Sequence, residues 1–199
     1  MSDMFCNAGI SATEWDIGDL SEWNTSKVTD MSLLFSYAGH NAKTFKIVGL
    51  DKWDTSKVTK MNAMFQYAGY SAAEWDIGNL QNWDTTDVTD LTYMFLRAGY
   101  NSKTFKIVGL DNWDTSNVTN MYGMFSETGY NATTWDIGNL QTWDTSKVTN
   151  MDYMFYYAGY KASYLLNLSN WNVRNVAKYN NFNSSVSSKV IAPSFGTSA

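Results

Sequence analysis

The sequence repeats with a fixed period of thirty residues from its first residue to about residue 160. Large apolar residues recur at the same three places in each copy. One column holds Met1, Met31, Met61, Leu91, Met121 and Met151, the second holds Phe5, Phe35, Phe65, Phe95, Phe125 and Phe155, and the third holds Trp23, Trp53, Trp83, Trp113 and Trp143. A unit of this size cannot enclose a core, so it buries its apolar face on neighbouring copies. The sequence therefore predicts a solenoid.

Composition agrees with a packed repeat protein and excludes several other classes. Aromatic residues make up 16% of the chain, too much apolar surface for a disordered tract. The net charge of -5 argues against a nucleic-acid partner, because phosphate binding needs a basic stripe. No apolar run approaches the roughly 18 to 20 residues that cross a bilayer, so we expect no membrane insertion. No signal peptide is recognisable in this chain, and a single cysteine, Cys6, can form neither an internal disulfide nor a thiolate metal site.

The fifth repeat predicts a short helix at its start. Thr119 is a suitable N-cap, and Met121, Met124 and Phe125 then fall at i, i+3 and i+4 on one helical face. Gly129 stands where a left-handed residue is expected to end the helix. Each copy of this segment should contribute one helix to a layer of the solenoid.

A half-buried strand should follow the helix. Trp135 and Ile137 alternate with Thr134 and Asp136, so one pair faces the core and the other faces outward. Equivalent strands of successive copies should pair in parallel, and crossovers between parallel strands are right-handed. We therefore expect an α/β solenoid, a right-handed coil with one short strand and one short helix per repeat and a parallel sheet on one face.

Two runs of the sequence resemble a known family. WNTSKVTDMSLLF, from Trp23 to Phe35, and WDTSKVTNMDYMF, from Trp143 to Phe155, are similar to the BspA-like leucine-rich-repeat surface proteins of bacteria. The resemblance covers five full repeats and most of a sixth, although this chain has extra residues between Ile137 and Trp143. It implies a leucine-rich-repeat-like fold, a role in adhesion, and an extracellular or cell-surface location for the parent protein.

A second period of sixty residues is superimposed on the first. The repeats alternate between Trp-Asp-Ile-Gly and Phe-Lys-Ile-Val-Gly, which gives an outward column of alternating charge: Asp16, Lys46, Asp76, Lys106 and Asp136. We favour a role in register, because slipping by one repeat would place like charges side by side. The alternative is a recognition strip for a polar ligand. Its candidate residues are Asp76, Thr104, Lys106, Thr134 and Asp136.

Two further columns have a structural and a functional interpretation. The mostly acidic column of Asn24, Asp54, Asp84, Asp114 and Asp144 could hold cations or act as paired carboxylates, but each member precedes Thr and a second hydroxyl residue, so we favour turn capping. The aromatic column of Tyr70, Tyr100, Tyr130 and Tyr160 could stack on sugar rings, but its position after the expected helix end also explains it by packing, which we favour. His40, the only histidine, is interpreted as a variant member of this column rather than a ligand or base.

The ends of the chain differ from its middle. Residues 1–162 are tandem repeats that start at residues 1, 31, 61, 91, 121 and 151, and residues 163–199 form a degenerate last repeat and a C-terminal cap. The cap includes Asn181, Phe182, Val190, Pro193 and Phe195. Met1 falls directly on a repeat position, so the chain is either a fragment cut at a repeat boundary, which we favour, or has an open end that supports end-to-end self-association.

These patterns predict a non-enzymatic binding and adhesion module of a bacterial surface or secreted protein. Its polar strand face would meet a protein or glycan of the host or of a neighbouring cell. The alternative is a structural spacer or self-assembling repeat element without a small ligand. An enzyme is disfavoured because one His, one Cys and no unique polar cluster leave no acid, base or nucleophile to assign, and no cofactor or metal is expected.

Overall fold

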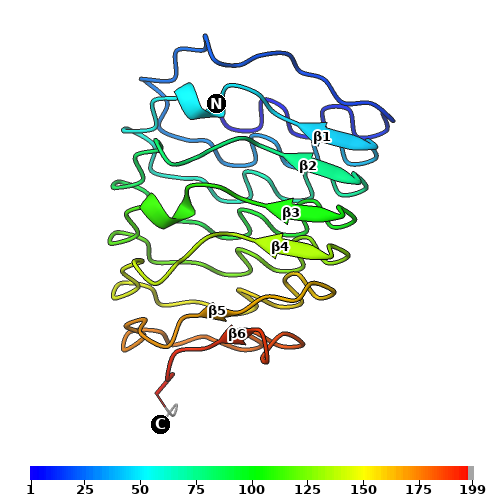
Figure 1. Cartoon of the computed structure of the whole chain (residues 1–199). Helices are drawn as coiled ribbons and strands as arrows, with labels where there is room; N and C mark the ends of the chain where they lie inside the picture. The colour runs from blue at the N-terminus through cyan, green and yellow to red at the C-terminus, as the bar shows by residue number, and fades with distance from the viewer. Residues whose placement is uncertain (197–199) are drawn as a thin grey trace.

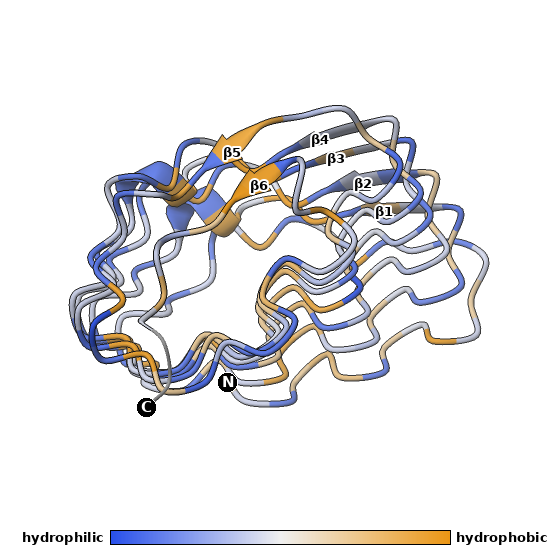
Figure 2. Ribbon diagram, turned by 90° about the horizontal axis from the view of Figure 1, so that it is seen from below, coloured by the Kyte–Doolittle hydropathy of each residue, from blue (hydrophilic) through white to orange (hydrophobic). Residues whose placement is uncertain are grey.

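The chain forms a stack of similar coils, each made by one repeat (Figure 1). The structure is a computed structural model and describes residues 1–196. Residues 197–199, which the sequence assigns to the C-terminal cap, lie outside the described part. Viewed along the stack, the coils follow one another closely, with the strands on one side and the N-terminus on the opposite side (Figure 2). The predicted repeat solenoid is confirmed.

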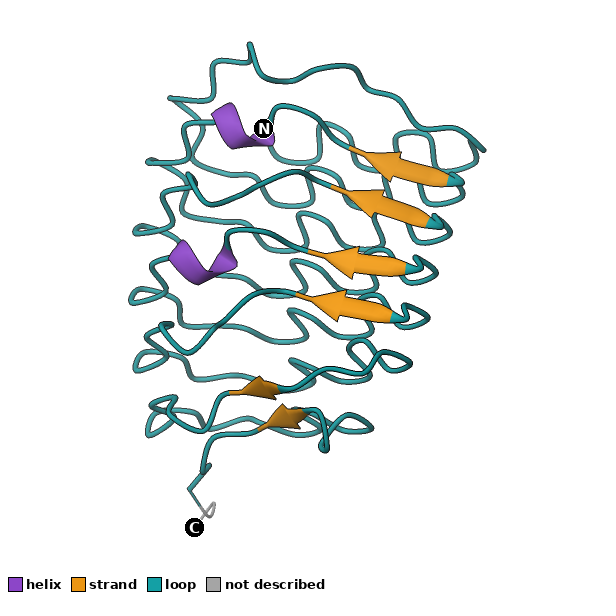
Figure 3. Cartoon of the chain, in the orientation of Figure 1, coloured by secondary structure: helices purple, strands orange, loops and turns teal. Residues whose placement is uncertain are grey.

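Short parallel strands occupy the same side of successive coils (Figure 3). One sheet contains β1 (Thr44–Lys46), β2 (Glu74–Asp76), β3 (Thr104–Lys106) and β4 (Thr134–Asp136) in that order, and a second contains β5 (Leu166–Asn167) and β6 (Val190–Ile191). In each strand of the first sheet the central aromatic residue is buried and its two neighbours are exposed. The half-buried strands and their parallel pairing therefore follow the sequence prediction.

The predicted helix at the start of each repeat is wrong. Within residues 1–196 the helices are two three-residue 3-10 turns, η1 (Leu50–Lys52) and η2 (Leu110–Asn112), and there is no α-helix. The segment expected to be helical is a run of tight turns. Its left-handed residues include Gly123 (φ 59°) and Glu127 (φ 55°), which an α-helix does not accept. Met121, Met124 and Phe125 are nevertheless fully buried, as their spacing predicted.

Hydrogen bonds between copies explain why turns replace the helix. Gly123, Phe125 and Glu127 donate their backbone N–H groups to carbonyls 29 residues later, at N···O distances of 2.7 to 2.9 Å. The intervening N–H groups of Met124 and Ser126 donate to carbonyls three residues back, at 3.3 and 3.1 Å. Successive N–H groups thus alternate: one donates to the next repeat, and the one after it donates within its own turn. We call residues 121–132 and their counterparts the turn segment.

This arrangement carries a conformational cost that the stack offsets. The equivalents of Gly123 and Glu127 in other repeats include left-handed Tyr93, Arg97 and Tyr157. A left-handed residue with a side chain costs roughly 1 to 2 kcal/mol. Each interface between turn segments adds several backbone hydrogen bonds, each worth about 1 kcal/mol, together with the burial of a Met and a Phe. An isolated helix of this length is only marginally stable and would form none of the bonds between copies.

Two buried polar columns tie neighbouring coils together. The indole N–H of Trp53 donates to the carbonyl of Leu20 at 3.0 Å, and the same bond joins the tryptophan and leucine columns up to Trp171. The hydroxyl of buried Thr55 donates to the carbonyl of Asp84 at 2.9 Å, and Thr25, Thr85, Thr115 and Thr145 bond in the same way to the next repeat. Buried carbonyls therefore find partners at the same place in every coil.

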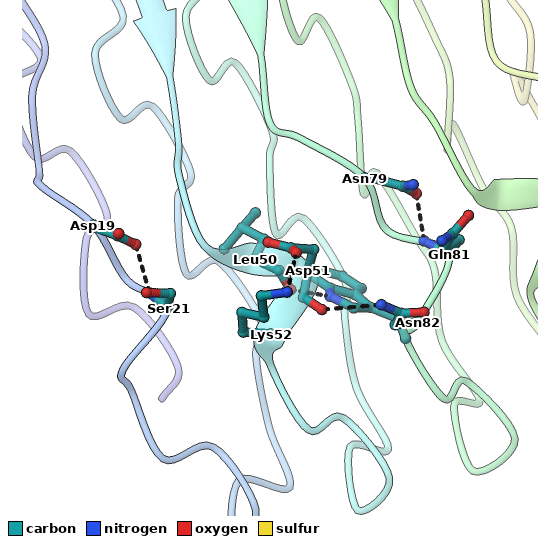
Figure 4. A network of polar contacts seen from close by, with 9 residues as sticks. Asp19, Ser21, Leu50, Asp51, Lys52, Asn79, Gln81 and Asn82 are labelled. Carbon is teal, nitrogen blue, oxygen red and sulfur yellow. Dashed lines mark hydrogen bonds and ion pairs between the residues drawn. The ribbon is translucent and has the colours of Figure 1, made fainter.

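The backbone itself alternates between odd and even repeats. In even repeats, Gly49 and Gly109 adopt φ values of 94° and 98° and precede η1 and η2. A Cβ on Gly49 would lie 2.2 Å from the backbone nitrogen of Ser21 in the preceding coil. In odd repeats a side chain stabilises the corresponding bend of the chain after the strand, which we call the corner. In the third repeat, for example, Asn79 accepts a hydrogen bond from the N–H of Gln81 at 2.9 Å (Figure 4). The sixty-residue period is thus a property of the main chain as well as of the charges.

Strand pairing alternates in step with that corner. β1 pairs with β2 through three residues, and β3 pairs with β4 through three residues. Between β2 and β3 the pairing is reduced to Glu74 with Thr104, and a separate bridge joins Asn79 to Val108. The strands of an even repeat and the next odd repeat therefore pair along their whole length. The strands of an odd repeat and the next even repeat pair at one residue only.

The degenerate last repeat continues the stack with an offset of two residues. Phe155 donates its N–H to the carbonyl of Phe182, 27 residues later, at 2.7 Å. Val190 is fully buried. Phe195 returns to stack on Tyr179 with ring centroids 4.4 Å apart. The described part of the C-terminal region thus covers the last core layer.

The left-handed turns predict different effects for two alanines of one repeat. Ala63→Gly should change the free energy of unfolding by less than about 0.5 kcal/mol, because relief of the left-handed strain at φ 55° offsets the lost methyl group. Ala68→Gly, at a buried position without positive φ, should cost about 1 to 2 kcal/mol. Urea denaturation followed by tryptophan fluorescence measures both. Equal losses would mean that the segment does not hold this conformation.

The alternating corner predicts a difference between two glycines. Gly109→Ala should cost about 3 kcal/mol, because its Cβ would lie 2.2 Å from the backbone nitrogen of Gln81 and its φ is 98°. Gly78→Ala is the matched control, since it has a φ of 73° but no atom within 4 Å, and should cost about 1 kcal/mol. Thermal denaturation of the two variants gives the comparison. A loss at Gly78 as large as that at Gly109 would contradict the close approach.

Candidate functional site

The strand face brings the predicted strip together. Asp76 ends β2, Thr104 and Lys106 flank the buried Phe105 of β3, and Thr134 and Asp136 flank the buried Trp135 of β4. All five strip residues, Asp76, Thr104, Lys106, Thr134 and Asp136, are exposed. Thr104 lies opposite Thr134, and Lys106 lies opposite Asp136. The strip is therefore a continuous polar surface across three strands.

Hollows recur on this face where the strands separate. One of about 320 Å³ lies between β2 and β3 and is lined by Ala73, Glu74, Trp75, Asp76, Lys103, Thr104 and Lys106. Another, of about 410 Å³, lies between the first and second repeats and extends further along the chain, where it is lined by Trp15, Asp16, Gly18, Asp19, Lys46 and Val48. Each hollow combines the Trp and Asp of an odd repeat with the Lys of the next even repeat. We call them the strand-face hollows.

The charges of the strip are held in place but only weakly paired. Asp76 accepts the N–H of Gly78 at 2.8 Å, and Asp16 and Asp136 make the same turn bond, which fixes one carboxylate oxygen of each. Lys106 Nζ lies 3.6 Å from Asp136 Oδ2, and both side chains are about half exposed. Within residues 1–196, no other neighbouring pair of the charge column lies within 4.0 Å. Exposed pairs of this kind contribute little to stability.

The predicted aromatic column is a tight stack of rings. Centroid separations are 4.7 Å for Tyr70 and Tyr100, 4.8 Å for Tyr100 and Tyr130, and 5.1 Å for Tyr130 and Tyr160, with interplanar angles of 5° to 23°. His40 extends the stack onto Tyr70 at 4.8 Å. Each inner ring has both faces covered by its neighbours. This geometry favours packing over sugar stacking, because only ring edges are left to a ligand.

The acidic column caps turns, as expected. Asp54 accepts the backbone N–H of Ser56 at 3.0 Å and its hydroxyl at 2.7 Å, and Asn24, Asp84, Asp114 and Asp144 accept the equivalent N–H. The hydroxyls of Ser56 and Ser146 hold the pKa values of Asp54 and Asp144 below the usual range. Within the described residues, no group of three or more His, Cys, Asp or Glu side chains is arranged to hold a metal ion.

A further hollow lies on the turn segments and was not predicted from the sequence. Its volume is about 230 Å³, and its lining comprises Tyr67, Tyr93, Leu96, Arg97, Tyr122, Ser126, Glu127, Tyr153 and Tyr156. We call it the tyrosine hollow. Its residues come from repeats three to six and occupy positions where the repeats differ from one another. The signal that sequence reasoning passed over was therefore departure from the repeat, above all Gly123, which stands where the neighbouring repeats have Tyr93 and Tyr153.

An ion pair forms the polar part of the tyrosine hollow. Arg97 donates from Nη1 to the hydroxyl of Tyr67 and from Nη2 to Glu127 Oε1, both at 2.9 Å. Burial lowers the pKa of the Arg97 guanidinium, but the hydrogen bond and charge of Glu127 outweigh it and raise the pKa. Burial, and then the phenol of Tyr122, raise the pKa of Tyr93. The hollow therefore holds one balanced pair of charges among phenol groups.

Fold and surface together define a repeat solenoid of short parallel strands whose outer faces carry polar and aromatic hollows. Among the described residues, no helix has the length and apolar character needed to span a membrane. The chain matches the family described as "Mycoplasma protein of unknown function, DUF285" over residues 1–100 and 68–191, and it belongs to that family. No curated protein and no solved structure matches the chain.

The ion pairs Lys106–Asp136 and Arg97–Glu127 predict different effects of mutation on stability. Lys106→Met should change the free energy of unfolding by no more than about 0.5 kcal/mol, because its pair with Asp136 is exposed. Arg97→Met should cost about 2 kcal/mol, because it removes two charge-assisted hydrogen bonds that are partly buried. Urea denaturation of the two variants gives the difference. Equal effects would show that the tyrosine hollow is no better ordered than the strand face.

Proposed function

We propose that the chain is a non-enzymatic binding and adhesion module that presents its strand face to a protein or glycan of a host or neighbouring cell. The observation that carries the proposal is the pair of strand-face hollows, which share three lining positions, the Trp and Asp of an odd repeat and the Lys of the next even repeat. Their recurrence favours binding over catalysis, because an active site is a singular arrangement.

The spacing of the hollows indicates the kind of ligand. Strands lie about 4.8 Å apart, so the Trp, Asp and Lys positions that the two hollows share recur roughly 10 Å apart along the stack, two repeats from one another. A polymer with regularly spaced polar groups would engage several hollows at once, and its later contacts would form at high effective concentration. Since the exposed Lys and Asp side chains gain little from each other, exchanging those contacts for a ligand costs little stability.

The similarity of Trp23–Phe35 and Trp143–Phe155 to BspA-like leucine-rich-repeat surface proteins supports the finer features of this proposal. These are a right-handed, leucine-rich-repeat-like coil and a bacterial parent protein that is secreted or displayed on the cell surface. A module of this kind would act by contact alone, without a cofactor, and its partner would be neither nucleic acid nor the membrane interior.

A second candidate function is a structural spacer or self-assembling repeat element. The first coil leaves apolar side chains uncovered: Trp23 is 37% exposed and Met4 is 53% exposed, whereas Trp53 in the next coil is 2% exposed. A second copy stacked on this layer would bury them. Light scattering over a wide range of concentrations tests the assembly, and a monomer at the highest concentration would exclude it.

Reversal of one charge tests the strand face. Lys106→Glu places three acidic residues, 76, 106 and 136, in one row, so binding to host proteins or arrayed glycans should fall by at least about tenfold for ligands that use the strip. Lys57→Glu is the matched control, because it makes the same charge change at an exposed position where the third repeat carries Asp87. Circular dichroism would check that both variants fold.

Two results would refute the proposal. One is a wild-type chain that binds no arrayed glycan or host protein above background. The other is a ligand that responds equally to Lys106→Glu and Lys57→Glu, because the loss would then reflect net charge rather than the strip.

A further inference from the structure

The geometry points to a second binding site, in which the tyrosine hollow binds one uncharged pyranose ring of a glycan. The hollow is on the turn segments, so this inference does not depend on the strand face. Its volume of about 230 Å³ suits a single sugar ring better than a folded or extended peptide. The argument rests on ring orientation, on the missing side chain at Gly123 and on charge balance.

Ring orientation separates this cluster from the stacked tyrosine column. Tyr122 meets Tyr93 at 68° and Tyr153 at 82°, and Tyr153 meets Tyr156 at 80°. In such edge-to-face pairs one ring covers a face of the other with its edge, and the rings do not shield one another on both faces as a parallel stack does. The four tyrosines are half-buried and all line the hollow, so we infer that part of their ring faces borders it. The C–H face of a pyranose is the chemical partner that such a surface accepts.

The absent side chain at Gly123 lets the Tyr93 ring lie against the backbone of the next repeat. A Cβ there would lie 2.7 Å from two ring carbons of Tyr93, so the ring can take this position only over a glycine. The equivalent positions of the adjacent repeats hold Tyr93 and Tyr153. Gly123 therefore fixes the place of the Tyr93 ring, which is part of the lining of the tyrosine hollow. The equivalent Ala63 has the same left-handed backbone, with φ 55° against 59° at Gly123, so the fold accepts alanine at this position.

Charge balance selects an uncharged ligand. Arg97 is held between the hydroxyl of Tyr67 and the carboxylate of Glu127, each at 2.9 Å. The charge of the guanidinium is already balanced by Glu127, and that of the carboxylate by Arg97, so neither an anionic nor a cationic ligand would meet an unbalanced charge. A sugar hydroxyl can both donate and accept, so it can bond to the carboxylate and to the phenol groups without displacing either partner.

Saturation-transfer NMR on the full 199-residue chain tests the inference with methyl glycosides of glucose, galactose, mannose and N-acetylglucosamine. We expect transfer from wild type to the ring protons of at least one of them. Gly123→Ala should weaken that binding by about tenfold or more, because the added methyl group displaces Tyr93 into the hollow. Tyr122→Ala should weaken it by about tenfold, through loss of a stacking face.

Two control variants make the result specific. Tyr160→Ala removes an exposed tyrosine of the stacked column and should leave the affinity for the glycoside within about twofold of wild type. Lys106→Glu, which tests the strand face, should also leave it unchanged, so that failure of one site does not imply failure of the other. Amide spectra of each variant would verify the fold.

Several outcomes would overturn the inference. These are no transfer to any of the four glycosides, full binding by both Gly123→Ala and Tyr122→Ala with an intact fold, and stronger binding of glucuronic acid or of a proline-rich peptide than of the uncharged sugars. Either of the last two ligands would assign the hollow to a different chemistry.

Discussion

The backbone hydrogen bonds between turn segments are the constraint on which the rest of the structure depends. Alternate N–H groups of each segment find their acceptors 29 residues away, so no repeat satisfies its own main chain. The insertion of one residue within a repeat would exchange the N–H groups that point along the stack with those that close turns. This accounts for a period that does not slip over five copies, and it explains the left-handed backbone at positions occupied by residues as large as Tyr93 and Arg97.

Buried side-chain bonds add a second restriction that acts on residue type. Trp53 and its equivalents need the indole N–H for a leucine carbonyl, and Thr55 and its equivalents need the hydroxyl for a carbonyl of the next repeat. Phenylalanine or valine would fill the space but leave an acceptor without a partner. The inner columns are therefore uniform, whereas outward positions can change without affecting the stack. Function is expected at those variable positions.

The sequence predicted burial better than conformation. Met121, Met124 and Phe125 are buried as their spacing required, and Trp135 lies in a half-buried parallel strand as its alternation required. The helix was wrong because i, i+3 and i+4 spacing also describes consecutive turns, and the acceptors that decide between them lie in another repeat. Gly123, in mid-segment, was the local sign against a helix. The strip was predicted because exposure follows alternation, but the tyrosine hollow depends on how rings from four repeats are oriented.

The alternation of charge is accompanied by an alternation of the main chain. The charge column was expected to act on register because a slip by one repeat would place like charges side by side; among neighbours of the column within residues 1–196, Lys106 and Asp136 alone lie within 4.0 Å. The main chain already distinguishes odd from even repeats, through Gly109 beside Gln81 and through the single pairing of Glu74 with Thr104. The main chain therefore restricts register in addition to any effect of the charges. Asp76 and Lys106 face each other across the opening where the strands separate, so a ligand that carries both donors and acceptors can bind between them without first breaking a strong ion pair.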